Sequence, residues 1–330
     1  MVKQVFFIFI VCVFNSGLVF CEDEKIGVPD RDDIEYPDDD APSKEEVQLG
    51  KMLYFDTRLS LKKNQSCATC HNPELGFGDG LKFSLGTMGG KVGRNAPHIY
   101  NLAWNSLFFW DGRAGSLEEQ ALGPIQAAGE MNMPLDKVIE RLKKVKFYRD
   151  GFEKVYKDKK IESKNIGKAI AAFERTIIVD NTPFDKYMKG DKDAMSPSAV
   201  NGMKLFKGKA NCTKCHSGPN FTDNSFHNIG VKGDDIGRQK LVKDATMKGA
   251  FKVPGLRNVL LTAPYMHDGS LSTLEEVIKF YNRGGDNKAN LSKEMKPLKL
   301  TDKEIMDLVS FLGSLTQQLD IKRPKIPKDD

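Results

Sequence analysis

The chain has 330 residues, 40% of them hydrophobic and 29% charged, and a formal net charge of +5. This composition is ordinary for a soluble globular protein, and the length suggests about two domains. A charge this small gives no reason to expect nucleic acid or a membrane surface as a partner.

Residues 1–21 have the pattern of a secretory signal peptide, with Lys3 ahead of an unbroken apolar run over residues 5–13. The run is too short to span a bilayer. Cleavage after Cys21 fits this pattern. A lipid attached to Cys21 fits it less well, because the three residues before Cys21 are not small. In either case the protein leaves the cytoplasm, and we expect a bacterial periplasm.

Residues 22–42 are acidic, poor in large apolar side chains and interrupted by three prolines. They are predicted to form an extended arm, and a solvated arm is favoured over one that docks onto the domains. Order is expected to begin at Ser43. Ser43 and Glu46 have the spacing of a capping box, and apolar residues follow at helical spacing.

This first helix leads to a C-x-x-C-H stretch at residues 67–71, and a second such stretch lies at residues 212–216. The pattern is the attachment signature of c-type haem, in which two thiols bond the porphyrin and the histidine reaches the iron. A zinc site would need further thiolates or histidines nearby, and a redox dithiol needs no histidine. We therefore predict two covalently bound haem c groups, attached through Cys67, Cys70, His71, Cys212, Cys215 and His216.

Each stretch lies between one helix and a later amphipathic helix, expected around residues 166–177 and 301–312. No alternating apolar run is long enough to indicate a substantial sheet. The predicted fold is mainly α, with two cytochrome c-like haem domains related by internal duplication. The expected bounds are 43–190 for the N-terminal domain, 191–315 for the C-terminal domain and 316–330 for a tail.

A second repeat follows each haem motif. Residues 110–119 match residues 267–276 at a constant offset of 157, and Arg-Asn pairs lie upstream at residues 94–95 and 257–258. Ser116 and Thr273 each have the spacing of a helix N-cap. In the second of these two helices Tyr281 lies on the apolar face, and the same offset carries Tyr281 back to Pro124.

The contrast between Tyr281 and Pro124 predicts that the two irons are not equivalent. A phenolate can ligate iron and a proline side chain cannot, so one iron would be closed and the other open. A core tyrosine with a satisfied hydroxyl is the alternative for Tyr281. Met266 and Met88 are further candidates for a distal ligand, and His227 is held in reserve.

The order and spacing of these motifs resemble the bacterial dihaem cytochrome c peroxidase and MauG superfamily over roughly residues 43–315. Besides the haem motifs, the resemblance rests on residues 94–97, 109–113, 262–269 and 273–276. It implies that the haem on His71 is the peroxidatic one, with Glu130 as the acid-base group for O–O cleavage. It also implies Gln120 and Pro124 in the distal pocket and Trp110 between the two haems.

The same resemblance implies a calcium ion between the domains, held by Asn95 and by the backbone oxygens of Thr262 and Pro264. Two departures separate this chain from peroxidases that are activated by reduction. Thr87 stands where those enzymes have a loop histidine, and Tyr281 stands where they usually have a methionine. Both departures favour the MauG-like branch and an enzyme that is competent without prior reduction.

We predict an exported peroxidase that reduces hydrogen peroxide at the His71 haem. Its electrons would come through the haem of His216 and Tyr281 from a small redox protein, a cytochrome c or a cupredoxin. MauG-like oxidation of a protein substrate is the alternative. A dihaem electron carrier is a third hypothesis, against which an open iron argues. Members of the family occur as monomers or dimers, so a homodimer is compatible with the resemblance.

Overall fold

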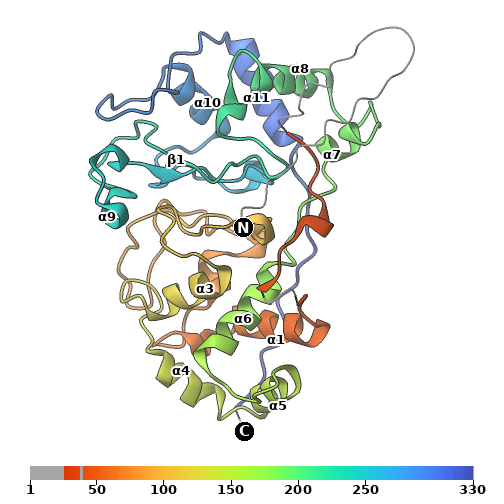
Figure 1. Ribbon diagram of the computed structural model, residues 1–330, viewed down its shortest axis with the longest axis vertical. Helices are drawn as coiled ribbons and strands as arrows, with labels where there is room; N and C mark the ends of the chain where they lie inside the picture. The colour runs from red at the N-terminus through yellow and green to blue at the C-terminus, as the bar shows by residue number, and fades with distance from the viewer. Residues whose placement is uncertain (1–25, 38–39, 330) are drawn as a thin grey trace, which may run out of the picture.

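The computed structural model describes residues 26–37 and 40–329, so the expected signal peptide and Cys21 lie outside the described residues. Regular structure in the described ranges is almost entirely helical, which confirms the predicted mainly α fold (Figure 1). One small antiparallel sheet there pairs β1 (Phe226–His227) with β2 (Phe251–Lys252). Within these ranges, no helix combines the length and the apolar character needed to cross a membrane.

The helices fall into two groups along the long axis of the molecule (Figure 1). The first half contains α1 (Lys44–Phe55), α2 (Cys67–Cys70), α3 (Leu117–Gln126), α4 (Leu135–Leu142), α5 (Lys146–Val155) and α6 (Ser163–Glu174). The second half contains α7 (Pro183–Met188), α8 (Pro197–Lys207), α9 (Gln239–Val242), α10 (Leu274–Asn282) and α11 (Asp302–Gly313). The two expected closing helices are α6 and α11.

Each half is organised by two helices that cross at a glycine, α1 with α6 and α8 with α11. A Cβ atom on Gly50 would lie 1.7 Å from the carbonyl oxygen of Ala169, and one on Gly202 would lie 1.9 Å from that of Asp307. Only glycine allows two backbones to approach this closely. The two crossings are equivalent, because Gly50 faces Ala169 and Phe173 while Gly202 faces Asp307 and Phe311, and both facing pairs are separated by the same 138 positions.

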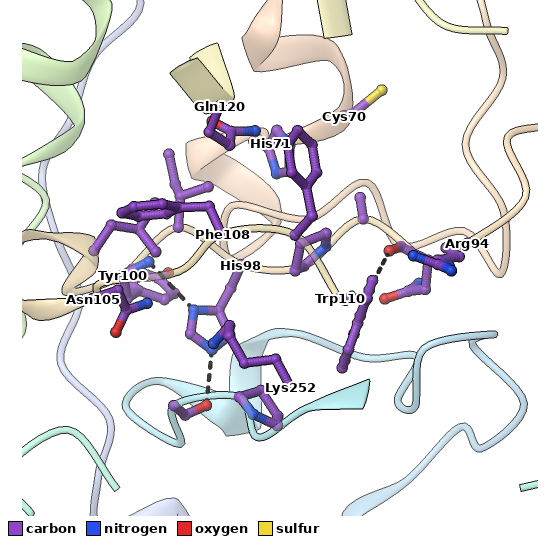
Figure 2. Close-up of a pocket in the computed structure, with 18 of the residues that line it drawn as sticks. Cys70, His71, Arg94, His98, Tyr100, Asn105, Phe108, Trp110, Gln120 and Lys252 are labelled. Carbon is purple, nitrogen blue, oxygen red and sulfur yellow. Dashed lines mark hydrogen bonds between the residues drawn. The ribbon is translucent and has the colours of Figure 1, made fainter. Parts of the chain in front are cut away.

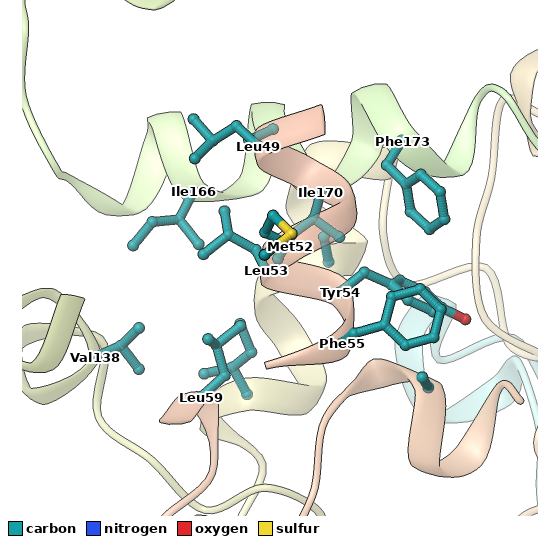
Figure 3. Close-up of a cluster of buried hydrophobic side chains, with 14 of the residues drawn as sticks. Leu49, Met52, Leu53, Tyr54, Phe55, Leu59, Val138, Ile166, Ile170 and Phe173 are labelled. Atoms are coloured by element: carbon teal, nitrogen blue, oxygen red, sulfur yellow. The ribbon is translucent and has the colours of Figure 1, made fainter. Parts of the chain in front are cut away.

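The first hydrophobic core lies between α1 and α6 and is closed by α4 and α5 (Figure 3). Leu49 and Leu53 of α1 meet Ile166 and Ile170 of α6, and all four side chains are buried. Burying one such side chain stabilises the fold by about 1.5–3 kcal/mol. This packing fixes the helix whose end leads toward the first haem motif.

The cap of α1 is confirmed in part. Ser43 Oγ accepts a hydrogen bond from the backbone N–H of Glu46 at 3.1 Å, as expected. The Glu46 carboxylate accepts a hydrogen bond from the Tyr156 hydroxyl instead of closing the box. The complete capping box is found at α11, where Thr301 and Glu304 bond reciprocally.

The second repeat is confirmed, with one correction. Helices α3 and α10 begin at equivalent residues, after the caps Ser116 and Thr273. The pairing of Arg94-Asn95 with Arg257-Asn258 was wrong. At the offset of 157 the counterpart of Asn258 is Asn101, and both asparagines have left-handed backbone and precede a short 3-10 turn.

These two asparagines perform the same packing role. The Asn101 side chain exchanges two hydrogen bonds with the backbone of Val179, and Asn258 does so with Gln317. Both acceptor segments follow the closing helix of their own half. The two Arg-Asn dipeptides resemble each other in sequence only. They are not separated by 157 residues, so Asn95 and Asn258 do not occupy equivalent positions in the two halves.

Packing changes from one half to the other earlier than the expected boundary at residues 190–191. Phe184 of α7 belongs to the second core, and Asp185 forms a buried ion pair with Arg257 of the second half. Helix α7 therefore packs as part of the C-terminal domain. The chain crosses between the halves before Pro183.

The two terminal segments dock onto the domains, contrary to the favoured solvated arm. Ile26 is buried in the second core, and the Trp104 indole N–H donates to the Asp30 carbonyl oxygen. The tail returns to the first half (Figure 1), where Arg58 donates to the Pro327 carbonyl oxygen. Apolar tail side chains such as Leu319 pack on the first core. Both segments therefore connect the halves.

Candidate functional site

Each haem motif forms one short turn. Residues 67–70 form α2, residues 212–214 form a 3-10 turn, and none of the four thiols is in a disulfide. Burial raises the pKa of each thiol, to about 11 for Cys70 and Cys215. Within the described residues, no group of three or more His, Cys, Asp or Glu side chains could hold a metal ion. This geometry disfavours the zinc alternative.

The two motif histidines are oriented by the same device. His71 Nδ1 lies 3.3 Å from the carbonyl oxygen of Phe77, and His216 Nδ1 lies 2.9 Å from that of Phe221. Both phenylalanines have left-handed backbone, with φ of 55° and 56°, which is rare for a bulky residue. A histidine that donates from Nδ1 presents Nε2 to a metal and keeps its ring orientation fixed.

A cavity lies beside Cys70 and His71 and extends to the boundary between the halves (Figure 2). It encloses about 1220 Å³ of space between the atoms, its opening to solvent included. Cys70 and His71 line it, and Cys67 lies on the same turn as Cys70. These features fit one haem c group, and the repeated motif at Cys212, Cys215 and His216 offers the same donors for a second.

The residues expected over the first haem do line this cavity. Helix α3 supplies Gln120 and Pro124 from successive turns of one face, and Glu130 lies in the segment that follows the helix. Burial raises the pKa of the Glu130 carboxyl above its usual value, against an opposing effect of Arg113. A carboxyl group with a raised pKa holds its proton to a higher pH than an exposed one and can take up and return it.

The loop with Thr87 is attached to this wall. The Thr87 backbone N–H donates to the Glu130 carbonyl oxygen at 2.7 Å, and its hydroxyl donates to Asn64 at 2.6 Å. Its neighbour Met88 is 60% exposed and does not line the cavity. The suggestion that Met88 approaches the first haem was therefore wrong, because the side chain points into solvent.

Tyr281 lies on α10, at the position equivalent to Pro124 on α3. Burial raises the pKa of its hydroxyl well above the usual value, and the Cys212 and Cys215 thiols add to the increase. The hydroxyl has no hydrogen-bond partner among the described residues.

The reserve candidate His227 is engaged elsewhere. Its Nε2 lies 2.9 Å from Ser225 Oγ and its Nδ1 lies 3.1 Å from Ser292 Oγ, so both ring nitrogens have partners. Met266 has left-handed backbone in the loop before α10, at the position equivalent to Phe109. Tyr281 therefore remains the strongest candidate among the residues considered for the second iron.

Trp110 lies where the two halves meet (Figure 2). Its indole N–H donates to the Asn95 carbonyl oxygen at 2.9 Å, and its ring meets His267 edge-on with the centroids 6.5 Å apart. His267 is the residue equivalent to Trp110 at the offset of 157. The Asn95 N–H donates to the His267 carbonyl oxygen, and the Lys252 N–H donates to that of Trp110. Equivalent residues of the two halves thus make equivalent hydrogen bonds across the boundary, as an approximate two-fold axis would require.

The residues expected to hold calcium come from facing sides of this boundary. The Asn95 side chain donates to the Leu81 carbonyl oxygen at 2.9 Å. Thr262 and Pro264 follow a 3-10 turn of the second half that ends at Leu261, and Gly76 of the first half approaches this turn closely. The donor set is made of backbone and amide oxygens, the kind that Ca²⁺ prefers.

One buried residue of the site, Lys252, escaped prediction from the sequence. His98 makes hydrogen bonds at both ring nitrogens, to the Gly255 carbonyl oxygen and from the Tyr100 N–H, and thereby joins the halves. Lys252 lines the cavity from the second half. The only available signal was the offset of 157, which places Lys252 opposite Asn95.

Comparisons with known proteins agree with this geometry. A family model described as di-haem cytochrome c peroxidase matches residues 44–193, and a cytochrome c model matches residues 199–316. The methylamine utilization protein MauG of Methylorubrum extorquens is 44% identical over 299 residues, which cover 89% of this chain and 85% of that protein. The cytochrome c551 peroxidase of Nitrosomonas europaea is 37% identical over 85% of this chain and 83% of its own.

A solved structure is also similar. The crystal structure of a MauG-like protein associated with microbial copper homeostasis superposes with a TM-score of 0.81, at 31% identity, over 91% of this chain and 95% of that one. Two cytochrome c domains in a dihaem family carry haem c, as the two motifs predicted. The chain belongs to the dihaem cytochrome c peroxidase and MauG family.

Proposed function

We propose that this oxidoreductase reduces hydrogen peroxide at the haem held by His71 and receives electrons through the haem held by His216. The observation that carries the proposal is the contrast between equivalent helices: α3 presents Pro124 where α10 presents Tyr281. Proline offers no ligand atom, so the His71 side keeps a position for peroxide. When bound, haem c supplies an iron that binds peroxide and exchanges electrons.

The residues around the cavity transfer protons and hold peroxide in position. Glu130 accepts a proton from the peroxide oxygen nearer the iron and returns it to the leaving oxygen as the O–O bond breaks. Gln120 lies one helical turn from Pro124 and holds peroxide in place by hydrogen bonding. Overall, hydrogen peroxide, two protons and two electrons give two molecules of water.

Trp110 is proposed as the electron path between the halves. It lines the cavity beside His71, and the bond from its indole N–H to Asn95 fixes the ring at the boundary. The electron donor would be a small redox protein, a cytochrome c or a cupredoxin. Contacts with such donors are characteristically small and transient.

MauG-like oxidation of a protein substrate is the second candidate. Tyr281 and Thr87 favour it, since they replace the methionine and the loop histidine expected in reductively activated peroxidases. Thr87 donates hydrogen bonds to the Asn64 side chain and to the Glu130 carbonyl oxygen. The 44% identity to a protein named MauG also supports this candidate. A dihaem electron carrier gains nothing from an open iron and is the weakest of the three.

Further parts of the proposal concern a second metal and the setting. We propose one calcium ion between the halves, held by Asn95 with the backbone oxygens of Thr262 and Pro264. Export to the periplasm follows from the pattern of residues 1–21. A homodimer is compatible with the family.

Ferric optical and EPR spectra of the purified protein test the open site. One high-spin and one low-spin haem are expected, and two low-spin haems would refute the proposal. Turnover of reduced cytochrome c with peroxide, measured without prior reduction, then separates the two enzymatic candidates. Fast turnover supports a peroxidase, and negligible turnover supports a dedicated protein substrate.

A further inference from the structure

Lys252 is a buried lysine at the boundary between the halves. Its side chain is 9% exposed, and its ammonium group contacts only neutral acceptors, Asn224 Oδ1 at 3.3 Å and the Val253 carbonyl oxygen at 3.2 Å. Lys252 forms no ion pair with a carboxylate of the described residues, and Asp223 acts on its charge from farther away. Burial without an anion costs an ammonium group several kcal/mol.

The other strongly buried cations of this region are neutralised. Arg257 forms a bidentate ion pair with Asp185, with distances of 2.9 and 3.0 Å. Arg94 pairs with both Asp111 and Asp235 at 2.7 Å. Lys252 therefore differs from these arginines, because its ammonium group has no carboxylate partner among the described residues and can bind an anion from outside the protein chain.

The position of Lys252 indicates what that anion is. The side chain lines the cavity that also contacts Cys70 and His71, and Figure 2 shows it beside His98. Burial, with a smaller contribution from the Lys252 charge, lowers the pKa of His98 to about 4, so that neighbour is neutral and cannot repel Lys252. Haem carries two propionate carboxylates at the edge remote from its thioether bonds. These are the anions that must be accommodated in this region.

We propose that Lys252 binds a propionate carboxylate of a haem at the boundary between the two halves. The ammonium group donates to the carboxylate and offsets its charge at a largely buried position. At the offset of 157 the first half has Asn95, which is neutral. The cation is therefore present once in the duplicated architecture, and it makes one haem easier to reduce than it would otherwise be.

The proposal rests on haem attachment and not on peroxide chemistry, so the two can fail separately. Spectroelectrochemical titration of Lys252→Met should show a lower midpoint potential for one haem, because the ferric form loses a nearby repelling charge. The spectrum of the haem that shifts identifies whose propionate is bound. Resonance Raman spectra should show a shift of the propionate bending band of that haem.

Two matched variants separate charge from folding. Lys252→Arg keeps the cation and should restore most of the potential and the Raman band. Lys248→Met removes an exposed lysine of the same segment and should change neither. Equal potentials in the wild type and in Lys252→Met would overturn the proposal.

A crystal structure of the haem-loaded protein decides the matter even if Lys252→Met does not fold. The Lys252 Nζ atom should lie within hydrogen-bond distance of a propionate oxygen, about 2.7–3.2 Å. A propionate turned away from Lys252, or an ion pair between Lys252 and Asp223 in its place, would overturn it.

Discussion

The two halves of the molecule share the parts that hold a haem and differ in the parts that surround it. In both halves two helices cross at a glycine, and the carbonyl oxygen of a phenylalanine orients the motif histidine. In both, an asparagine also hydrogen-bonds the backbone of the segment that follows the closing helix. The distal walls differ at Pro124 and Tyr281. Duplication thus preserved the attachment motif and its geometry, while the residues proposed to control the iron and its protons diverged.

The structure adds a second difference, behind the histidines. Tyr54 and Phe206 occupy equivalent places, each 5.1 Å from a phenylalanine of the closing helix. Only Tyr54 has a hydroxyl, which donates to the His71 carbonyl oxygen at 2.6 Å. Glu174, 4% exposed, lies near Tyr54, and its counterpart 138 positions later is Leu312. The first half is therefore more polar on this side as well.

The largest expected effect comes from the acid-base group of the open site. Glu130→Gln keeps the shape of the side chain and removes its proton transfer, so kcat/KM for peroxide should fall by about 10²–10⁴-fold. In the wild type kcat/KM should rise with pH as Glu130 ionises, at a pKa above the usual carboxyl range because the group is buried. Stopped-flow kinetics over a range of pH measures both.

The exposed Glu153 is the matched control for this change. It forms a surface ion pair with Lys159, and Glu153→Gln should leave the kinetics unchanged. A Glu130→Gln enzyme with wild-type kinetics would remove Glu130 from the mechanism.

Removing the proposed second ligand should make the two halves more alike. Tyr281→Phe deletes the oxygen and keeps the ring, so the low-spin haem should become high-spin while the spectrum of the His71 haem stays the same. EPR at low temperature resolves the two populations. An unchanged low-spin signal would show that another residue ligates the second iron.

Glu174 should make the stability of the first half depend on pH. Burial raises its pKa from 4.5 to about 8, and its Oε2 atom has no hydrogen-bond partner within the described residues. Because the folded pKa exceeds the unfolded one, the stabilisation is full below pH 4.5 and is lost as pH rises toward about 8. The total is at most about 5 kcal/mol.

Glu174→Gln should flatten this dependence, as measured by urea unfolding of the haem-loaded protein between pH 5 and pH 8. The reverse change, Leu312→Glu, should impose a similar dependence on the second half. Parallel curves for the wild type and Glu174→Gln would mean that Glu174 finds a partner in the folded protein.

The smallest effect should be equal in the two halves. Gly50→Ala and Gly202→Ala each place a Cβ atom against a carbonyl oxygen, at 1.7 and 1.9 Å, and should lower the free energy of unfolding by about 1–3 kcal/mol. In Gly313→Ala, at the end of α11, the new atom would meet Leu260 at 3.8 Å and should cause no loss. A clear difference between the first two variants would contradict equivalent crossings.

Much of the fold and of the site could be predicted because the signals are local or repeated. The haem motifs occupy five consecutive residues each, the helix caps depend on neighbours three positions apart, and the offset of 157 relates α3 to α10 without any structure. Errors arose where contacts are distant in sequence. The arm at Ile26 was expected to be solvated, and no contact was predicted for the tail at Leu319. The docking of both depends on apolar surfaces formed by other parts of the chain.

The sequence by itself determined the two attachment sites, the helical duplication and the contrast between Pro124 and Tyr281, because these depend on residue identity and spacing. Only the tertiary structure brought Lys252 to a cavity beside His71 and left the buried Glu174 Oε2 atom without a hydrogen-bond partner in the part of the chain that the structure describes. Burial and the lack of a counter-ion are properties of surroundings assembled from residues far apart in the sequence. No pattern of neighbouring residues encodes them.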